Sequence, residues 1–243
     1  MRYTGKICLA FFIALIYSSI ARCQVTNFDG NVYDTVVIGQ QTWLKSDLLV
    51  THFRNGDSIP NVVEAKDWIR LKTCAYCDYS DVTANSKFTN RLYNWYCVID
   101  TAGLCPVGFH VPDGVEWKKL INFLGGNFEA GGRLKSTKNW EPPNEAASDS
   151  VGFSALPGGH RFTDGAFLTK GYNGNWWTST KHSLIHAYSI SLNTYTGFID
   201  NSNFDNKAGL SVRCIKDKVA ATNPLPEPIK TLDLPKDSLK SGQ

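Results

Sequence analysis

The stretch PDGVEWKKLINFLGG, residues 112–126, carries a full set of signals for one amphipathic helix. Pro112 precedes the expected first turn, Asp113 can cap it, and Glu116 follows three residues later, as in a capping box. Apolar residues recur at helical spacing, at Trp117, Leu120, Ile121 and Leu124. Gly125-Gly126 then ends the period. The sequence therefore predicts a helix over 113–124 with one buried face.

The segments on either side predict a mixed architecture. Upstream, residues 32–38 are typical of a strand, and residues 91–99 place four apolar side chains on one helical face. Downstream, apolar and polar residues alternate over 187–192 and 210–214, as in strands, and no further helical period follows Gly126. The order of one strand, two helices and then short antiparallel strands with long Gly-rich loops favours an α+β fold.

Residues 1–23 have the layout of a secretory signal peptide. A basic start precedes an apolar run over 7–20, and small residues follow it. The run is shorter than the roughly 20 residues that a bilayer span needs, so we expect no transmembrane span in the mature chain. Cleavage after Ala21 or after Cys23 satisfies the small-residue rule. Cys23 also raises lipoprotein anchoring, although Arg22 stands where a bacterial lipobox has Gly, Ala or Ser.

The C-terminal end differs in composition from the rest of the chain. Residues 218–243 contain four of the ten prolines and no aromatic residue, and their charges are mixed. Such a segment is typical of an extended or flexible spacer. We therefore expect one domain over 24–217, followed by a tail over 218–243.

Charge excludes two classes of partner. The chain has 25 Lys and Arg against 22 Asp and Glu, a net charge of +3. Arg2, Lys6 and Arg22 lie in the expected signal peptide, so 22 basic residues face 22 acidic ones in the mature chain. A neutral protein lacks the electrostatic basis for binding nucleic acid or anionic lipid.

Cysteines are numerous for the length. Seven are present, and Cys74 and Cys77 have the CxxC spacing shared by redox and zinc sites. A zinc site needs a second close pair, and a redox motif belongs at a helix start in a βαβ unit; neither accompanies these two. In an oxidising compartment structural disulfides are the default, and we expect them here.

A series of short motifs resembles a known family. In chain order they are Asp29–Tyr33, Ile38–Trp43, Leu92–Tyr96, Gly103–Pro106, Gly108–Pro112, Glu116-Trp117, Leu124–Gly126, Ala130–Gly132, Leu134-Lys135, Gly152–Gly159, Trp176–Thr180 and Ser211–Cys214. Over residues 29–217 the chain is similar to the Fibrobacter succinogenes major paralogous domain, found in exported proteins of Fibrobacter and Bacteroidetes. The ending Trp-Trp-x-Ser-Thr to Ser-Val-Arg-Cys also resembles the C-type lectin-like fold, including its formylglycine-generating-enzyme branch.

The resemblance implies a fold and some pairings but no activity. It implies a C-type lectin-like α+β domain, with strand 32–38 beside the C-terminal strand 210–216. Cys97 stands where the family commonly has Ala, and Cys74 is also extra, so the two are expected to pair and to leave Cys77 unpaired. A bridge between Cys105 and Cys214 is expected to join the 113–124 helix to the last strand.

Two segments contain residue types that bind metal ions. His182 and His186 have an i, i+4 spacing, but on a strand they would lie about 13 Å apart, too far for one ion. Residues 200–206 are rich in Asp and Asn and would suit calcium, although a polar hairpin turn is the favoured interpretation. We therefore expect no metal or other cofactor, with calcium as the alternative.

Aromatic residues after the last expected helix are the candidates for ligand contact. Trp140, Tyr172 and Trp177 each lie in or beside Gly-, Asn- or Pro-rich sequence, where loops on a rigid scaffold carry binding residues. Packing beneath the long loops is the competing interpretation. Trp176 and Trp177 are adjacent on a strand, so we expect one to be buried and the other available.

These observations lead to one functional hypothesis with two alternatives. We expect an exported, non-enzymatic module, secreted or held at the outer cell surface, that binds an extracellular glycan or a surface protein. The first alternative is an oxidoreductase similar to formylglycine-generating enzymes, with Cys74 and Cys77 as its local thiol pair. The second is a structural component of a surface layer or fibre.

Overall fold

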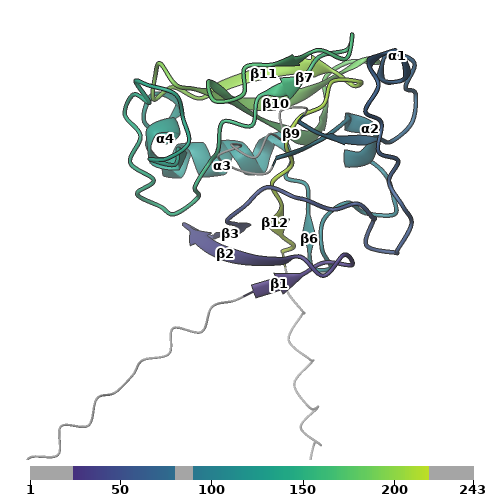
Figure 1. The fold of residues 1–243 in the computed structure, drawn as a ribbon. Coiled ribbons are helices and arrows are strands. Elements are labelled where there is room, and N and C mark those ends of the chain that lie inside the picture. Colours follow the sequence, from purple (N-terminus) through teal and green to yellow (C-terminus); the bar gives the residue numbers. More distant parts are fainter. Residues whose placement is uncertain (1–23, 80–89, 219–243) are drawn as a thin grey trace, which may run out of the picture.

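A computed structural model describes residues 24–79 and 90–218 of the chain. The expected signal peptide, with Cys23, and the tail from residue 219 lie outside the described residues. The described part has mixed α and β structure (Figure 1). Its strands are β1 Gln24–Thr26, β2 Val32–Ile38, β3 Gln41–Leu44, β4 Tyr76–Asp78, β5 Arg91–Tyr93, β6 Phe109–His110, β7 His160–Arg161, β8 Phe167–Leu168, β9 Asn173–Lys181, β10 His186–Asn193, β11 Asp200–Asp205 and β12 Ile215–Lys216. Its helices are α1 Ala65–Trp68, α2 Trp95–Val98, α3 Gly114–Phe123 and α4 Asn127–Leu134.

Two antiparallel sheets form the framework. Five strands follow the order β1-β2-β3-β12-β6, and three follow the order β11-β10-β9. In Figure 1 the five-stranded sheet lies at the bottom, where the described chain begins and ends, and the three-stranded sheet lies at the top. The expected α+β class is confirmed.

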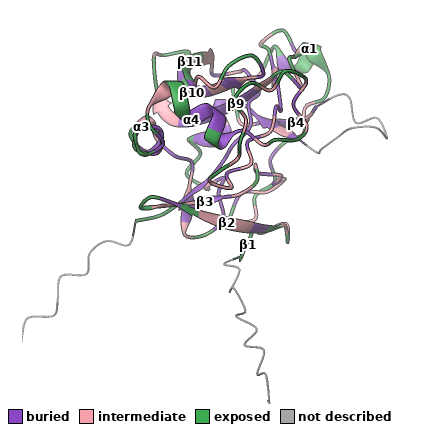
Figure 2. Cartoon of the chain, turned by 90° about the vertical axis from the view of Figure 1, so that its left-hand side faces the viewer, coloured by how far each residue is buried: buried purple, intermediate pink, exposed green. Residues whose placement is uncertain are grey.

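Helix α3 lies between the two sheets and has the predicted local chemistry. Asp113 accepts a hydrogen bond from the Glu116 backbone N–H at 2.7 Å, and the Glu116 carboxylate accepts one from the Asp113 backbone N–H, which completes the capping box. The predicted apolar face is buried between strand residues of both sheets. The helix therefore joins the sheets through one apolar core cluster. Figure 2 shows buried segments, in purple, around β9 and β10.

Both expected disulfides are present. Cys105 pairs with Cys214, 109 residues away, and so joins the segment before β6 and α3 to the approach to β12. Cys74 pairs with Cys97, which joins the segment before β4 to α2. Cys77 is unpaired and buried.

The expected juxtaposition of strand 32–38 and strand 210–216 is corrected. Both β2 and β12 belong to the five-stranded sheet, but β3 lies between them. The Gly39 turn sends the chain straight back along β2, so β3 occupies the position next to it. Residues 210 and 211 form only isolated bridges to other segments, and the regular strand is confined to 215–216.

Local assignments also need correction. Residues 91–99 are not one helix: Arg91–Tyr93 form β5 with β4, and only Trp95–Val98 are helical. Helices α1 and α4 were not expected, so the described residues hold four helices rather than two. The 200–206 segment is mainly strand β11 rather than a turn. His182 and His186 face each other across the β9–β10 hairpin, where the His182 N–H donates to the His186 carbonyl at 3.0 Å.

Candidate binding site

A groove of about 700 Å³ lies beside α4. Three segments line it: α4, the loop 145–150 that follows it, and the loop 195–197 between β10 and β11. We call it the α4 groove; its lining residues are Phe128, Glu129, Gly132, Arg133, Glu145, Ala146, Ser148, Ser150, Tyr195, Thr196 and Gly197. Its volume is within the range of small-ligand sites.

Two exposed aromatic rings line the α4 groove, and each is supported by a second ring. Tyr195 is 60% exposed and stacks with Tyr172, with ring centroids 6.5 Å apart and planes 25° apart. Phe128 is 81% exposed and packs against Phe198 at 5.3 Å. Such contacts restrict the rotamers of rings that would otherwise move freely in water. Each lining ring thus has one aromatic neighbour that limits its side-chain freedom before any ligand arrives.

A glycine pair in α4 lets the two loops approach the helix closely. A Cβ atom at Gly132 would come within 3.0 Å of the Ala146 carbonyl oxygen. A Cβ atom at Gly131 would come equally close to the Gly197 carbonyl oxygen. The Gly132 carbonyl in turn accepts a hydrogen bond from the Ser148 N–H at 2.8 Å. Only glycine permits this separation, so the Gly-Gly sequence sets the depth and width of the groove.

The loop on one side of the groove has an unusual backbone. Five non-glycine residues between 139 and 154 have a positive φ, and Thr169 is the only other described non-glycine residue that has one. Ala146 is among them, at φ 59°, and its side chain has no polar atom to compensate. Left-handed residues of this kind cluster where the surrounding structure imposes them, commonly at binding sites. The five are Asn139, Asn144, Ala146, Asp149 and Ser154.

A buried lysine supports the groove from inside. Lys135 follows the last residue of α4 and is fully buried. Its Nζ donates to the carbonyl oxygens of Glu145 at 2.7 Å, Asn193 at 3.0 Å and Thr196 at 2.9 Å. Burial lowers the pKa of Lys135 to about 8, and the nearby Glu145 carboxylate opposes that shift. The ammonium group is therefore still charged at pH 7.

Charged side chains on the lining are available to a ligand. Glu129 and Arg133 lie on α4, Glu145 lies on the facing loop, and all three are exposed. None of the three forms an ion pair with another described residue. Ser148 and Ser150 add hydroxyl groups. The groove thus offers apolar ring faces beside hydrogen-bond donors and acceptors.

The structure separates the three aromatic residues that the sequence singled out. Tyr172 is 43% exposed and belongs to the site through its contact with Tyr195. Trp140 is buried in the core cluster of α3, and its ring lies 5.4 Å from the Lys135 Nζ. Trp177 is fully buried in a different part of the core. The assignment of Trp140 and Trp177 to a ligand-facing surface is therefore wrong.

The expectation that Trp176 or Trp177 is available is wrong for a related reason. Both are buried, at 1% and 0% exposure. Strand β9 lies between two core clusters, so Trp176 packs with α3 on one side and Trp177 packs near Tyr93 on the other.

Sequence reasoning missed the two lining rings. Tyr195 occurs in the turn-like sequence Asn-Thr-Tyr-Thr-Gly, residues 193–197, between two strands. Phe128 comes directly after Gly125-Gly126-Asn127, where the helical period ends. An aromatic residue in a polar turn was the available signal for Tyr195. Phe128 had no comparable signal, because α4 itself was not predicted.

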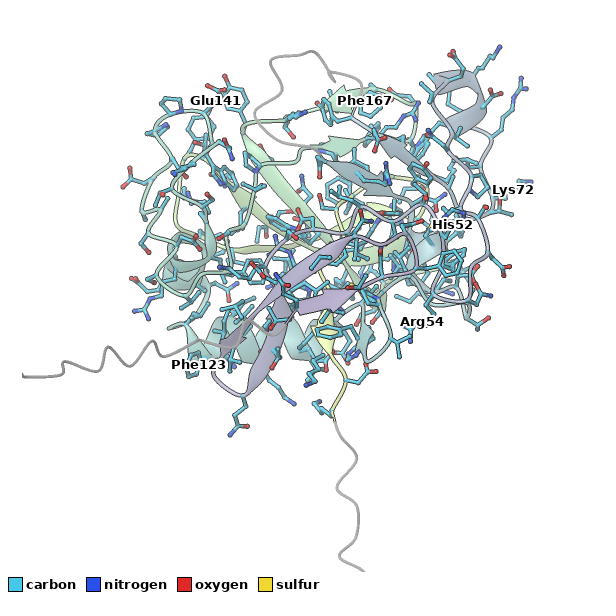
Figure 3. The ribbon with its side chains drawn as sticks, turned by 60° about the horizontal axis from the view of Figure 1, so that its bottom comes forward. His52, Arg54, Lys72, Phe123, Glu141 and Phe167 are labelled. Atoms are coloured by element: carbon cyan, nitrogen blue, oxygen red, sulfur yellow. A yellow bond between two sulfur atoms is a disulfide. The ribbon has the colours of Figure 1, made fainter. Side chains whose placement is uncertain are left out.

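Another polar cluster lies elsewhere on the domain. Asp29 accepts hydrogen bonds from both the backbone and the side chain of Thr51, and its carboxylate is 2.5 Å from His52 Nδ1. Burial alone would raise the pKa of Asp29, but these hydrogen bonds outweigh it and lower the pKa. Figure 3 shows His52 and Arg54 on one side of the molecule, away from Glu141. The contacts tie the β1–β2 turn to the segment after β3.

The cysteines do not form the thiol pair that an oxidoreductase would need. Cys74 is bonded to Cys97, and burial raises the pKa of Cys77 to about 11, which keeps that thiol protonated. Within residues 24–79 and 90–218 no group of three or more His, Cys, Asp and Glu side chains is arranged to hold a metal ion. No helix in the same ranges has the length and hydropathy of a membrane span.

Comparison with known proteins assigns the family. The family model of the Fibrobacter succinogenes major domain matches residues 36–216, about three quarters of the chain. The chain therefore belongs to this family, as the motifs indicated. No curated protein and no solved structure matches it. The residues of the α4 groove between 128 and 197 all lie inside the matched range.

Proposed function

We propose that this member of the Fibrobacter succinogenes major domain family is a non-catalytic module that binds a glycan outside the bacterial cell. The proposed binding site is the α4 groove. The observation that carries the proposal is the pair of exposed, supported rings, Tyr195 and Phe128, in a groove whose other lining groups are charged or hydroxylic.

This combination matches the chemistry of a sugar. A pyranose ring presents apolar C–H faces that pack on aromatic rings, and hydroxyl groups that hydrogen-bond to carboxylates, guanidinium groups and serines. The ring contacts limit side-chain freedom before binding, so less conformational entropy is lost on association. A concave site of this volume also fits a small ligand better than the flatter surface of a folded protein.

The cellular setting of the proposal rests on two features. Two disulfides in the described residues support an oxidising compartment, and residues 1–23 have the sequence of a signal peptide. We propose a C-type lectin-like arrangement of the domain, supported by the presence of both β1 and β12 in the five-stranded sheet and by the long loops after α3 (Figure 1). No metal is part of the proposal, so binding should survive EDTA.

A glycan array followed by calorimetry on the mature full-length chain tests this function. Tyr195→Ala and Phe128→Ala should each weaken binding by at least about fivefold, which corresponds to about 1 kcal/mol, with little change in melting temperature. Tyr188→Ala and Phe123→Ala are the matched controls, because these rings are also exposed but do not line the α4 groove.

The outcome is decisive in both directions. Loss of affinity in the groove variants alone supports the site. If the array shows no glycan bound above background, or if the control variants lose as much affinity as the groove variants, the proposal is wrong.

A further inference from the structure

The head group of Lys135 is surrounded by main-chain oxygens. Three carbonyls converge on Nζ at 2.7 to 3.0 Å, which uses all three N–H donors of an ammonium group. No described carboxylate lies within ion-pair distance of Nζ. Three dipoles of this kind, with the Trp140 ring beside them, are the arrangement that a protein uses to hold a small cation.

The three carbonyls belong to segments that are far apart in sequence. Glu145 and Thr196 come from the two loops that line the α4 groove, and Asn193 is the last residue of β10. The Glu145 N–H also donates to the Thr194 carbonyl at 2.8 Å, next to the same point. One ammonium group therefore connects both groove loops to the end of α4.

Charge is needed in this position. A neutral apolar side chain would leave the three carbonyls without the donor that the buried Lys135 gives them, and each polar group that loses its partner costs stability. Carbonyls that point at one another also repel unless a positive charge lies between them. The two loops would then move apart, and the positions of the rings and carboxylates on them would change.

We propose that the three carbonyl oxygens form a cation cradle, that the Lys135 ammonium occupies it, and that this internal cation sets the spacing of the groove loops. Lys135 is thus a positioning residue for the α4 groove rather than a ligand contact. Its consequence for glycan binding rests on the proposed function, but the cradle itself does not. The cradle is expected to accept a free alkylammonium ion when the lysine side chain is removed.

Chemical rescue tests the cradle directly. In Lys135→Ala, amide hydrogen exchange at Glu145 and Ser148 should accelerate at least about tenfold, because local opening becomes easier. Propylammonium chloride should slow that exchange again and raise the melting temperature along a saturable curve, as a ligand that binds only the folded state does. Sodium chloride at the same ionic strength serves as the salt control. The wild type should not respond to propylammonium, because its cradle is filled.

Lys135→Met separates charge from packing, since methionine fills much of the space without a donor. It should show accelerated exchange at the same amides and no rescue. Should Lys135→Ala fail to fold, this variant alone carries the test. The proposal would be overturned if the amides of Lys135→Met exchanged as slowly as those of the wild type. It would also be overturned if propylammonium changed the exchange and the melting temperature of Lys135→Ala and of the wild type equally.

Glycan affinity provides the link to function. At concentrations that slow amide exchange in Lys135→Ala to the wild-type rate, propylammonium should also restore its glycan affinity to within about threefold of the wild type. Rescue of exchange without any glycan binding by the wild type would reject the proposed function and leave the cradle supported. Glycan binding by Lys135→Met with wild-type affinity would reject the positioning role.

Discussion

Replacing Gly132 by alanine should destabilise the domain, although alanine is the better helix former. Gly132 lies in the interior of α4, where intrinsic propensity alone would favour alanine by about 1 kcal/mol. The structure predicts the opposite sign. The new Cβ would lie within 3.0 Å of the Ala146 carbonyl oxygen and 3.1 Å from its carbonyl carbon, and both atoms belong to main chain that cannot rotate away.

The magnitude follows from three contributions. Overpacking against backbone costs about 1–3 kcal/mol. Displacement of the loop would also weaken the hydrogen bond from the Ser148 N–H to the Gly132 carbonyl, worth about 1 kcal/mol. After the propensity gain is subtracted, a net loss of about 2 kcal/mol remains. In a domain of this size that corresponds to a melting temperature lower by about 6 °C.

Calorimetric melting of Gly132→Ala and of a control variant measures the effect. Gly114→Ala is the matched control, because Gly114 also lies in a helix but its new Cβ would meet Thr180 Oγ1 only at 3.5 Å, an ordinary contact. The control should melt within about 2 °C of the wild type. A Gly132→Ala variant that melts at or above the wild-type temperature would refute the argument that close backbone approach shapes the α4 groove.

Three further predictions concern the scaffold. Replacing Cys105 and Cys214 together by serine should lower the free energy of unfolding by about 4–5 kcal/mol in the chain-entropy model, measured by urea titration. Replacing Cys74 and Cys97, which close a shorter loop, should lower it by about 3–4 kcal/mol, and an equal or larger loss would contradict the dependence on loop length. Trp177→Ala should cost about 3–5 kcal/mol in the same assay, because the indole is fully buried; a loss below about 1 kcal/mol would contradict its core position. For His110, burial alone would lower the pKa, but hydrogen bonds to two carboxylates outweigh it and raise the pKa above 6.5. The stability that it contributes is thus fully present below about pH 6.5 and is lost as the pH rises through its raised folded-state pKa. The difference in unfolding free energy between wild type and His110→Gln should therefore shrink as the pH rises above about 6.5. A difference that grows would be evidence against the two hydrogen bonds.

Elements with complete local signals could be predicted from the sequence. Helix α3 has a cap, a capping box, an apolar face and a glycine stop, and each of these is present in the structure. Strand β2 and strand β10 were recognisable from β-branched residues or alternation. In these segments local propensity and tertiary packing favour the same conformation, which is why sequence alone was sufficient.

Helix α4 could not be predicted because its sequence follows tertiary demands. Its two glycines weaken helix propensity, and they are present because two loops pack against the helix backbone. Phe128 faces solvent and breaks the apolar period that a core-facing helix would show. The candidate site was missed with it, since Phe128 and Arg133 both lie on α4.

The choice among aromatic residues was also beyond the sequence. Trp177 and Tyr195 both occur near Gly- and Asn-rich turns, yet one is fully buried and the other is 60% exposed. The difference arises because β9 is covered on both faces, whereas the β10–β11 loop projects from the end of the sheet. Which strand is covered twice depends on the packing of α2 and α3 against it, and no pattern within the strand records that packing.

The arrangement of the chain ends bears on how the α4 groove would be used. The described chain begins in β1 and ends after β12, and both strands belong to the five-stranded sheet. In Figure 1, α4 lies to the left of α3, on the side of the three-stranded sheet and away from β1. The Cys105–Cys214 disulfide reinforces the five-stranded end, and Lys135 holds the groove loops by contacts that involve none of those strands. A load applied through β1 or β12 would therefore act on the five-stranded sheet before it reached the groove loops.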